Sequence, residues 1–445
     1  MERRTAPELW REAVRKAPPE PAYLEERDDG WRPVAWTEAA ERIEALARGL
    51  LARGVRHGDR VAVLSRTRLE WLLLDWAVLS IGAVIVGLYP TSSAKECEYV
   101  LGHCEAVLAF TEDEEQTRKL VSVRSGLPAL REVIPFDRLA KLEAEGRLAR
   151  HLRPPIVEET DLATLIYTSG TTGPPKGCML THRNLVAAAT AVREGLQHPG
   201  DVVLLFLPLA HSYGRLAHQA AAHRGATVAL VADAARVPEA LTAVRPTILP
   251  AVPRVYEKVY ASTLAEIERA GGLRRWIGRR ALAVGRSASR ARRQGTPPPR
   301  LLAMQERLAD RLVFARVRER LGGRLRLGVS GAAPLSTEVL EFFHAVGVPV
   351  LEGYGLTETG SSATVNDPHD IRVGTVGRPV EGTEIRLAPD GEILIRSDAV
   401  FAGYYKDPEA TAAALTDDGW LRTGDVGELD PDGFLRITDR KKDLI

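Results

Sequence analysis

An eleven-residue stretch of the chain, Tyr167 to Gly177, combines the residue types that bind phosphate groups; its sequence is YTSGTTGPPKG. Glycines allow the backbone to approach an anion closely, hydroxyl and N–H groups donate to phosphate oxygens, and Lys176 adds a mobile positive charge. The candidate phosphate-binding residues are Thr168, Ser169, Gly170, Thr171, Thr172, Gly173 and Lys176. A surface loop rich in glycine and threonine is the alternative, but the stretch directly follows a predicted buried strand, which favours phosphate binding.

The spacing around the lysine differs from that of P-loop nucleoside triphosphatases. Their loop has glycine immediately before the lysine and serine or threonine after it, whereas Pro175 and Gly177 flank Lys176 here. Residues 178–180 are predicted to be extended, so the next helix is expected to begin near Thr181. The sequence therefore disfavours a kinase or P-loop enzyme.

Four later segments and one histidine carry further groups suited to a nucleotide and a carboxylic acid. They are Gly331-Ala332-Ala333-Pro334, Tyr354-Gly355-Leu356-Thr357-Glu358-Thr359, Thr423-Gly424-Asp425, Asp439-Arg440-Lys441-Lys442-Asp443, and His211 within LPLAH. A tyrosine ring can stack on a base, and carboxylates can bind Mg²⁺ or sugar hydroxyls. Taken singly, each of them is more simply explained by a structural role, as a core tyrosine, a solvated glutamate, a turn aspartate or a buried histidine.

Together, these segments resemble the motifs of the adenylate-forming superfamily, which includes acyl-CoA synthetases, luciferases and peptide-synthetase adenylation domains. The motifs occur in the expected order over nearly the whole chain. The resemblance implies that Lys176, Thr357, Glu358 and His211 are catalytic, with Glu358 binding Mg²⁺, Thr357 donating to the α-phosphate and His211 near the acyl carboxylate. The expected nucleotide-binding residues are the phosphate loop together with Gly331, Ala332, Ala333, Gly353, Tyr354, Gly355, Asp425 and Arg440, and Lys442 is expected in a hinge.

Within the superfamily, the resemblance is to long-chain fatty acyl-CoA synthetases. It implies ATP-dependent activation of a medium- or long-chain fatty acid to acyl-adenylate and then acyl-CoA, with ATP, Mg²⁺ and coenzyme A, and an acyl tunnel lined by residues 212–216. No Phe-Asp pattern follows His211, which disfavours amino-acid substrates. The alternatives are another carboxylic acid such as an aryl acid, acyl transfer to a carrier protein, or a non-catalytic lipid- or nucleotide-binding module.

The composition fits a globular protein: of 445 residues, 45% are apolar and 27% are charged. No secretion signal is visible, and the three cysteines show no metal-ligand spacing, so we expect reduced thiols in the cytoplasm. Residues 71–89 form an apolar stretch nearly as long as a membrane span, but Asp75 and Gly82 interrupt it. We expect a buried helix followed by a buried strand there.

The alternation of helix and strand predicts a mixed α/β protein with two doubly wound α/β lobes and a small antiparallel, barrel-like β subdomain. The expected ranges are 1–160 for the first lobe, 161–369 for the second, 370–438 for the β subdomain and 439–445 for the hinge. Within the second lobe, 167–177 is the phosphate loop and 271–326 a helical insertion. Because the chain stops at a hinge motif, we expect a small C-terminal domain to be absent and activity to be low.

The net charge of +1 conceals a strongly basic segment. Residues 271–326 contain sixteen arginines, no lysine and only three acids, a local charge of +13 that leaves −12 for the remainder. Two amphipathic helices joined near residues 295–299 are predicted. A solvated face is the favoured interpretation, and a peripheral contact with the anionic inner face of a membrane is the alternative. Nucleic acid is not an expected partner, and a homodimer is left open.

Overall fold

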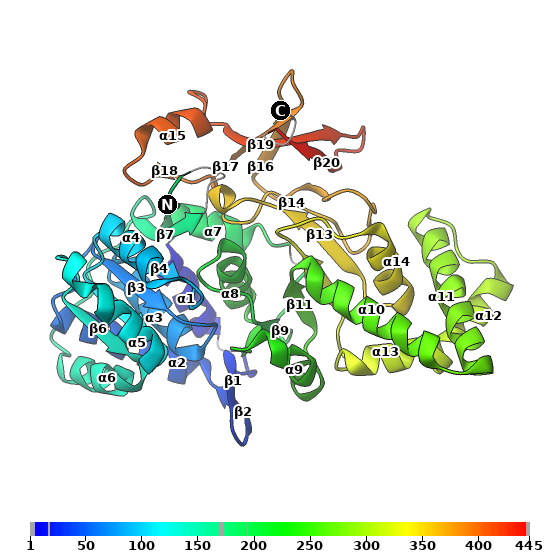
Figure 1. Ribbon diagram of the computed structural model, residues 1–445, viewed down its shortest axis with the longest axis horizontal. Coiled ribbons are helices and arrows are strands. Elements are labelled where there is room, and N and C mark those ends of the chain that lie inside the picture. Colours follow the sequence, from blue (N-terminus) through cyan, green and yellow to red (C-terminus); the bar gives the residue numbers. More distant parts are fainter. Residues whose placement is uncertain (1–4, 17, 169–172, 194, 442–445) are drawn as a thin grey trace.

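The computed structural model describes residues 5–16, 18–168, 173–193 and 195–441. Two large sheets lie side by side, and a smaller one lies across the gap above them (Figure 1). The first large sheet has seven strands, in the order β18 (Gly403–Tyr404), β8 (Lys176–Thr181), β7 (Leu162–Thr168), β4 (Val84–Leu88), β3 (Arg60–Leu64), β5 (Leu108–Thr111) and β6 (Glu132–Pro135). Strands β7, β4, β3, β5 and β6 are parallel, whereas β8 and β18 are antiparallel to their neighbours.

Helices cover both faces of this sheet, as the alternation of β3 side chains requires. Val61 and Val63 face a core formed with α1 (Ala6–Lys16), α2 (Trp36–Ala52), α3 (Leu69–Ser80) and α6 (Leu139–Leu148). Ala62 and Leu64 face a second core formed with α4 (Ala94–Cys104) and α5 (Glu114–Val123). The predicted doubly wound arrangement is confirmed for this lobe.

The second large sheet has nine strands. Their order is β15 (Arg378–Pro379), β14 (Thr364–Val365), β13 (Val350–Tyr354), β12 (Leu327–Ser330), β11 (Ile248–Ala251), β9 (Val202–Leu205), β10 (Thr227–Leu230), β1 (Tyr23–Arg27) and β2 (Gly30–Val34). One face packs on α7 (His182–Thr190) and α8 (Ser212–Arg224). The other packs on α9 (Val237–Val244), α10 (Pro253–Arg269) and α14 (Thr337–Val346), so this lobe is also doubly wound.

The basic segment forms the far end of this second lobe (Figure 1). It consists of α11 (Gly272–Arg293), α12 (Arg300–Ala309), a π-helical turn (Asp310–Phe314) and α13 (Ala315–Arg320). The predicted pair of helices is therefore confirmed, with a link at residues 294–299.

The small sheet is antiparallel throughout and contains β16 (Thr383–Leu387), β17 (Glu392–Ser397), β19 (Leu421–Leu429) and β20 (Leu435–Arg440). The helix α15 (Pro408–Ala414) precedes β19. The two hairpins predicted from the Pro-Asp-Gly and Asp-Pro-Asp-Gly turns are confirmed, because β16 pairs with β17 and β19 with β20.

Each of the two large sheets contains strands from both sides of residue 160 in the sequence. Strands β1 and β2 precede that residue but lie in the nine-stranded sheet, where Tyr23 is opposite Val228. Strands β7 and β8 follow it but extend the seven-stranded sheet, where Thr164 is opposite Ile85. A boundary at residue 160 therefore does not separate the two sheets, because pairing between distant segments decides which sheet a strand joins.

The apolar stretch at residues 71–89 forms most of α3 followed by β4, as predicted. No helix among the described residues is long and apolar enough to cross a membrane. Asp75 of α3 is buried and forms an ion pair of 2.7 Å with Arg215 of α8. The polar interruption noted in the sequence thus joins the helices of the two lobes.

Candidate active site

A cavity of about 560 Å³ lies between the two large sheets and beneath the small one. Most of the predicted site residues line it: Thr168, Lys176, His211, Gly331, Ala332, Gly353, Gly355, Thr357, Glu358, Asp425 and Arg440. Tyr354 lies behind this lining, whereas Ala333 and Gly173 are exposed away from it. Ser169, Gly170, Thr171, Thr172 and Lys442 lie outside the described residues.

The end of the cavity where phosphate binding is expected is built on the β7–β8 hairpin, where Thr168 and Lys176 are directly opposite each other. The helix that follows begins only after Thr181, which caps it by accepting from Asn184 N. As predicted, the described segment that follows the phosphate loop is the strand β8 and not a helix. The lysine therefore carries the positive charge at this end of the cavity.

Glu358 lies in a 3₁₀ turn, Thr357–Thr359, that follows β13. The Tyr404 hydroxyl donates to Glu358 Oε1 over 2.6 Å. Within the described part of the chain, no three His, Cys, Asp or Glu side chains group as a metal cage. A single carboxylate in a phosphate site fits Mg²⁺, which is usually bound by one or two carboxylates together with substrate phosphates and water.

The opposite wall of the cavity carries Asp425 on β19. The Tyr354 hydroxyl donates to Asp425 Oδ2 over 2.7 Å, and Arg440 Nε lies 3.4 Å from Oδ1. Asp425 is buried, so its carboxylate is a fixed hydrogen-bond acceptor, which suits the expected binding of sugar hydroxyls. Nearby, Ala332 adopts φ +70°, a conformation that non-glycine residues rarely use and that often marks functional loops.

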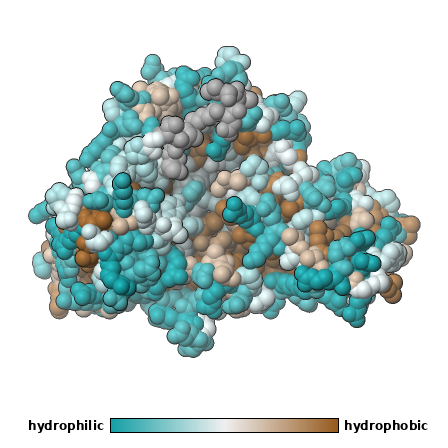
Figure 2. Space-filling view, viewed as in Figure 1, coloured by the Kyte–Doolittle hydropathy of each residue, from teal (hydrophilic) through white to brown (hydrophobic). Residues whose placement is uncertain are grey.

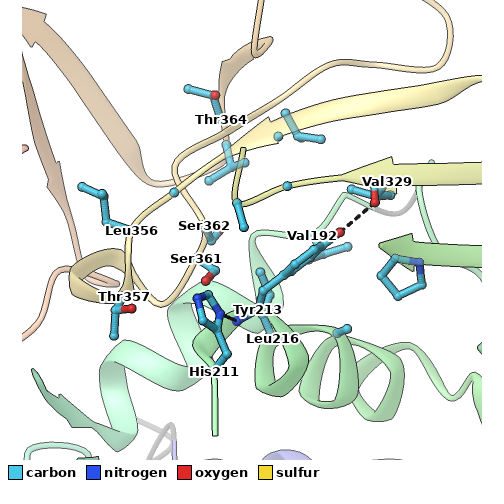
Figure 3. A pocket seen from close by; sticks show the side chains of 18 of the residues that line it. Val192, His211, Tyr213, Leu216, Val329, Leu356, Thr357, Ser361, Ser362 and Thr364 are labelled. Carbon is cyan, nitrogen blue, oxygen red and sulfur yellow. Dashed lines mark hydrogen bonds between the residues drawn. The ribbon is translucent and has the colours of Figure 1, made fainter. Parts of the chain in front are cut away.

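His211 is the N-cap residue of α8. Its ring Nδ1 accepts from Tyr213 N over 3.2 Å, which places the proton on Nε2 (Figure 3). Burial lowers the pKa of His211, so the ring is neutral at pH 7. A neutral imidazole with a free Nε2–H is a hydrogen-bond donor suited to a carboxylate or a carbonyl oxygen.

Beyond His211 the cavity becomes apolar. Tyr213, Leu216, Ala217 and Ala220 form one stripe of α8 along it, at the spacing of a single helix face. Side chains from the strands and from the segment after α7 complete the wall: Val192, Leu196, Val203, Ile248, Pro250 and Val329. The Tyr213 hydroxyl donates to the Val329 carbonyl over 2.8 Å, which holds its ring across the cavity (Figure 3).

Two of the five residues expected to line an acyl tunnel lie on the cavity wall. Tyr213 and Leu216 line the cavity. Ser212 instead lies 2.5 Å from the hydroxyl of Ser361, Gly214 packs against the Pro208 carbonyl, and Arg215 pairs with Asp75. Successive helical residues point in different directions, so only one face of α8 can reach the cavity.

Four residues that the sequence did not single out belong to the site. Tyr404 and Asp407 contact Glu358 and Lys176, and Ala217 and Ala220 line the apolar end. The Asp-Pro pair at 407–408 is typical of a helix start, but it does not indicate a neighbouring lysine 231 positions earlier. The alanines carry no chemical signal.

The sequence profile of the family described as "AMP-binding enzyme" matches residues 10–405. The long-chain-fatty-acid–CoA ligase FadD15 of Mycobacterium bovis is 42% identical over 430 residues, which are 94% of this chain and 71% of that protein. The peroxisomal long chain acyl-CoA synthetase 6 of Arabidopsis thaliana is 34% identical over 92% of this chain and 62% of its own length.

Solved structures show the same fold. The inhibitor-bound N-terminal domain of FACL13 from Mycobacterium tuberculosis matches with a TM-score of 0.77 and 25% identity, over 98% of this chain and 100% of that one. The anthranilate CoA ligase AuaEII with anthranoyl-AMP matches with a TM-score of 0.78 and 22% identity, over 100% of this chain and 78% of that one. On the match of the family profile and the identity with the FadD15 ligase, the chain belongs to the AMP-binding, adenylate-forming enzyme family.

Proposed function

We propose that this chain is an acid–thiol ligase that activates a medium- or long-chain fatty acid with ATP, releasing pyrophosphate, and passes the acyl group to coenzyme A with release of AMP. The observation that carries this proposal is that one cavity holds Lys176, Glu358 and Asp425 at its polar end and is apolar at its other end. A nucleotide and an acyl chain can meet there at His211, between the two ends. The FadD15 relatives, which are fatty-acid ligases by name, support the same acid class.

In the first step, a carboxylate oxygen of the acid attacks the α-phosphorus, and the bond to pyrophosphate breaks with its electron pair on the leaving oxygen. Lys176 neutralises charge on the phosphates, and Thr357 donates to the α-phosphate. The His211 Nε2–H orients the attacking carboxylate, and Asp425 fixes the ribose. Catalysis by this set is alignment and charge neutralisation, with no protein nucleophile.

Glu358 would hold Mg²⁺, which when bound supplies charge neutralisation of the phosphates. In the second step, the coenzyme A thiolate attacks the carbonyl carbon of the acyl-adenylate, and the carbon–oxygen bond to AMP breaks. The His211 Nε2–H is placed to donate to the carbonyl oxygen as charge develops on it.

Affinity for a graded series of acyl-sulfamoyl adenosines tests the substrate class. We expect tighter binding as the acyl chain lengthens from 4 to about 12 carbons, at roughly fourfold per methylene from ~0.8 kcal/mol of apolar burial. A preference for aryl analogues would establish the aryl-acid alternative. Acid-dependent ATP–pyrophosphate exchange tests catalysis, and its complete absence with every acid would leave a binding module. Transfer to a carrier protein instead of coenzyme A would correct the acceptor.

The same proposal includes a peripheral contact of residues 271–326 with an anionic membrane surface. Six exposed apolar side chains lie in this segment: Leu273, Trp276, Leu301, Met304, Leu308 and Leu312. Eight of its arginines form no ion pair with any described residue: Arg274, Arg275, Arg280, Arg300, Arg307, Arg311, Arg316 and Arg324. Figure 2 shows apolar side chains among polar ones at this end of the molecule. Apolar residues bordered by arginine suit the interface of an anionic bilayer.

Sedimentation with vesicles tests this contact. We expect binding to phosphatidylglycerol vesicles that weakens as salt rises, and much weaker binding to phosphatidylcholine. Leu301→Gln with Met304→Gln should lower binding to the anionic vesicles. Leu148→Gln is the matched control, because Leu148 is 86% exposed and lies on α6, far from the segment in the chain. Equal binding to both vesicle types would contradict the proposal. The homodimer remains a prediction.

A further inference from the structure

The ammonium group of Lys176 is held by a carboxylate in this structure. Its Nζ lies 3.4 Å from Asp407 Oδ2 and 5.3 Å from the centroid of the Tyr404 ring. These contacts follow from strand pairing. Lys176 is the first residue of β8, β18 pairs with β8 through Tyr404 and Cys178, and Asp407 follows β18 by three residues.

Asp407 uses its two oxygens differently. Oδ1 accepts from Ala410 N over 2.9 Å and so caps α15, whereas Oδ2 lies beside Lys176. The cap, together with the charge of Lys176, lowers the pKa of Asp407, so the carboxylate is ionised at neutral pH. The position of the charge is therefore fixed by the helix that it caps.

The same turn contacts the second charged group of the phosphate site. The Tyr404 hydroxyl donates to Glu358 Oε1, and the Phe401 N–H donates to the Glu358 carbonyl over 2.8 Å. Residues 401–407 thus hold a cation and an anion of the site in place. The residues that hold them, Asp407 and Tyr404, lie outside the motifs identified in the sequence.

The pair between Lys176 and Asp407 is open to exchange. The two side chains are 40% and 36% exposed, and ion pairs of this exposure are weak. A polyphosphate carries more negative charge than one carboxylate, so it can displace Asp407 from the ammonium group. Lys176 cannot neutralise both partners fully at once.

We propose that Asp407 is a positioning residue that competes with the polyphosphate for Lys176. It holds the ammonium group when no nucleotide is bound, yields it to the β- and γ-phosphates of ATP, and takes it back as pyrophosphate leaves. The inference rests on the proposed binding of ATP at this cavity. Asp407 thereby takes part in pyrophosphate release, because it replaces the leaving phosphates as the partner of Lys176.

The variant Asp407→Asn separates the charge from the cap, because asparagine caps a helix as well as aspartate does. We expect it to bind α,β-methylene-ATP about threefold more tightly than the wild type, and to bind AMP, which lacks the β- and γ-phosphates, unchanged. Pyrophosphate should inhibit exchange at correspondingly lower concentration. Thermal unfolding should be unchanged if the cap is retained.

Two further variants keep the test specific. Asp418→Asn is the matched control, because Asp418 is an aspartate of the same subdomain that pairs with Arg386 and does not line the cavity. In a Lys176→Met background, Asp407→Asn should no longer change the ratio of the affinity for α,β-methylene-ATP to the affinity for AMP. Isothermal titration calorimetry supplies the nucleotide affinities.

Failure of the inference and failure of the proposed function give different results. If the wild type binds neither nucleotide, the proposed function is wrong. If it binds both, the ratio of the affinity for α,β-methylene-ATP to the affinity for AMP decides. If Asp407→Asn leaves this ratio unchanged or lowers it, Asp407 does not compete with the polyphosphate for Lys176, and the inference is overturned. If the change persists without Lys176, the effect does not act through that residue, and the inference is equally overturned.

Discussion

The hydroxyl of Tyr354 donates a hydrogen bond of 2.7 Å to Asp425 Oδ2, and this bond joins the nine-stranded sheet to the small antiparallel sheet. Tyr354 ends β13, and Asp425 lies in β19. Burial and the neighbouring carboxylate raise the pKa of Tyr354, so its hydroxyl keeps the proton that it donates. The contact that orients the expected ribose ligand is thus also a contact between two sheets.

Removing this bond should therefore affect binding and stability together. Tyr354→Phe keeps the ring but leaves Asp425 short of one donor, and we expect a loss of about 1.5–3 kcal/mol in the free energy of unfolding. AMP should bind several-fold more weakly. Urea unfolding and calorimetry check both values. Tyr405→Phe is the control, and similar losses in the two variants would show that the bond is not responsible.

Glu352 should make stability depend on pH. Burial raises the pKa of this carboxyl to about 7, although the Leu335 N–H donates to its Oε1. A raised pKa means that the folded state holds the proton more tightly, so stability is greatest below the ordinary value of 4.5 and falls as pH rises through 7. The loss at higher pH should reach up to about 3 kcal/mol.

Glu352→Gln keeps an acceptor for the Leu335 N–H but does not titrate. We expect its unfolding free energy to fall less than that of the wild type between pH 5 and pH 8, as measured by urea titration at each pH. Parallel profiles for the two proteins would show that the carboxyl does not titrate in this range.

The buried pair of Asp75 and Arg215 should be costly to break. Both side chains are only 2–3% exposed, so Arg215→Met would leave an uncompensated carboxylate between the lobes. We expect a loss of about 3–5 kcal/mol. Asp75→Leu combined with Arg215→Met should recover most of it, because no charge then remains buried. A double variant as unstable as the single one would contradict this account.

Ala220 should limit the length of the acyl chain. It lies seven residues after Tyr213 on the cavity face of α8, about 10 Å further along the helix at 1.5 Å per residue. Ala220→Leu fills part of the apolar end. We expect affinity for a 12-carbon acyl-sulfamoyl adenosine to fall at least tenfold and affinity for the 4-carbon analogue to stay the same. Equal losses for both would indicate a general disturbance of the helix.

Much of the fold could be predicted because local pattern determines it. The runs at residues 202–206 and 227–231 are short and apolar, and they form β9 and β10 with ends shifted by one residue. The turn residues at 389–391 and 430–433 bound hairpins as expected. Sheet membership could not be predicted, because Tyr23 finds its partner near Val228, and nothing in either segment specifies the other.

The site, like the fold, has a part that the sequence predicts and a part that depends on tertiary contacts. Lys176, Glu358 and Asp425 have side chains whose chemistry is visible in the sequence, and all three line the cavity. Asp407 and Tyr404 act through residues more than forty positions away, so only the pairing of β18 with β8 reveals them. A motif indicates which group does chemistry, whereas the groups that hold it depend on tertiary contacts.

The exchange of strands between the two large sheets has a consequence for biosynthesis. The hairpin of β1 and β2 leaves the ribosome early, yet its neighbour β10 follows about 200 residues later, a delay of roughly 10–40 s at ordinary rates of translation. During that interval Tyr23 and its neighbours have an unpaired edge, which is the kind of surface that aggregates or recruits a holding chaperone. The edge of β1 is therefore covered only after the segment that contains β10 has been made.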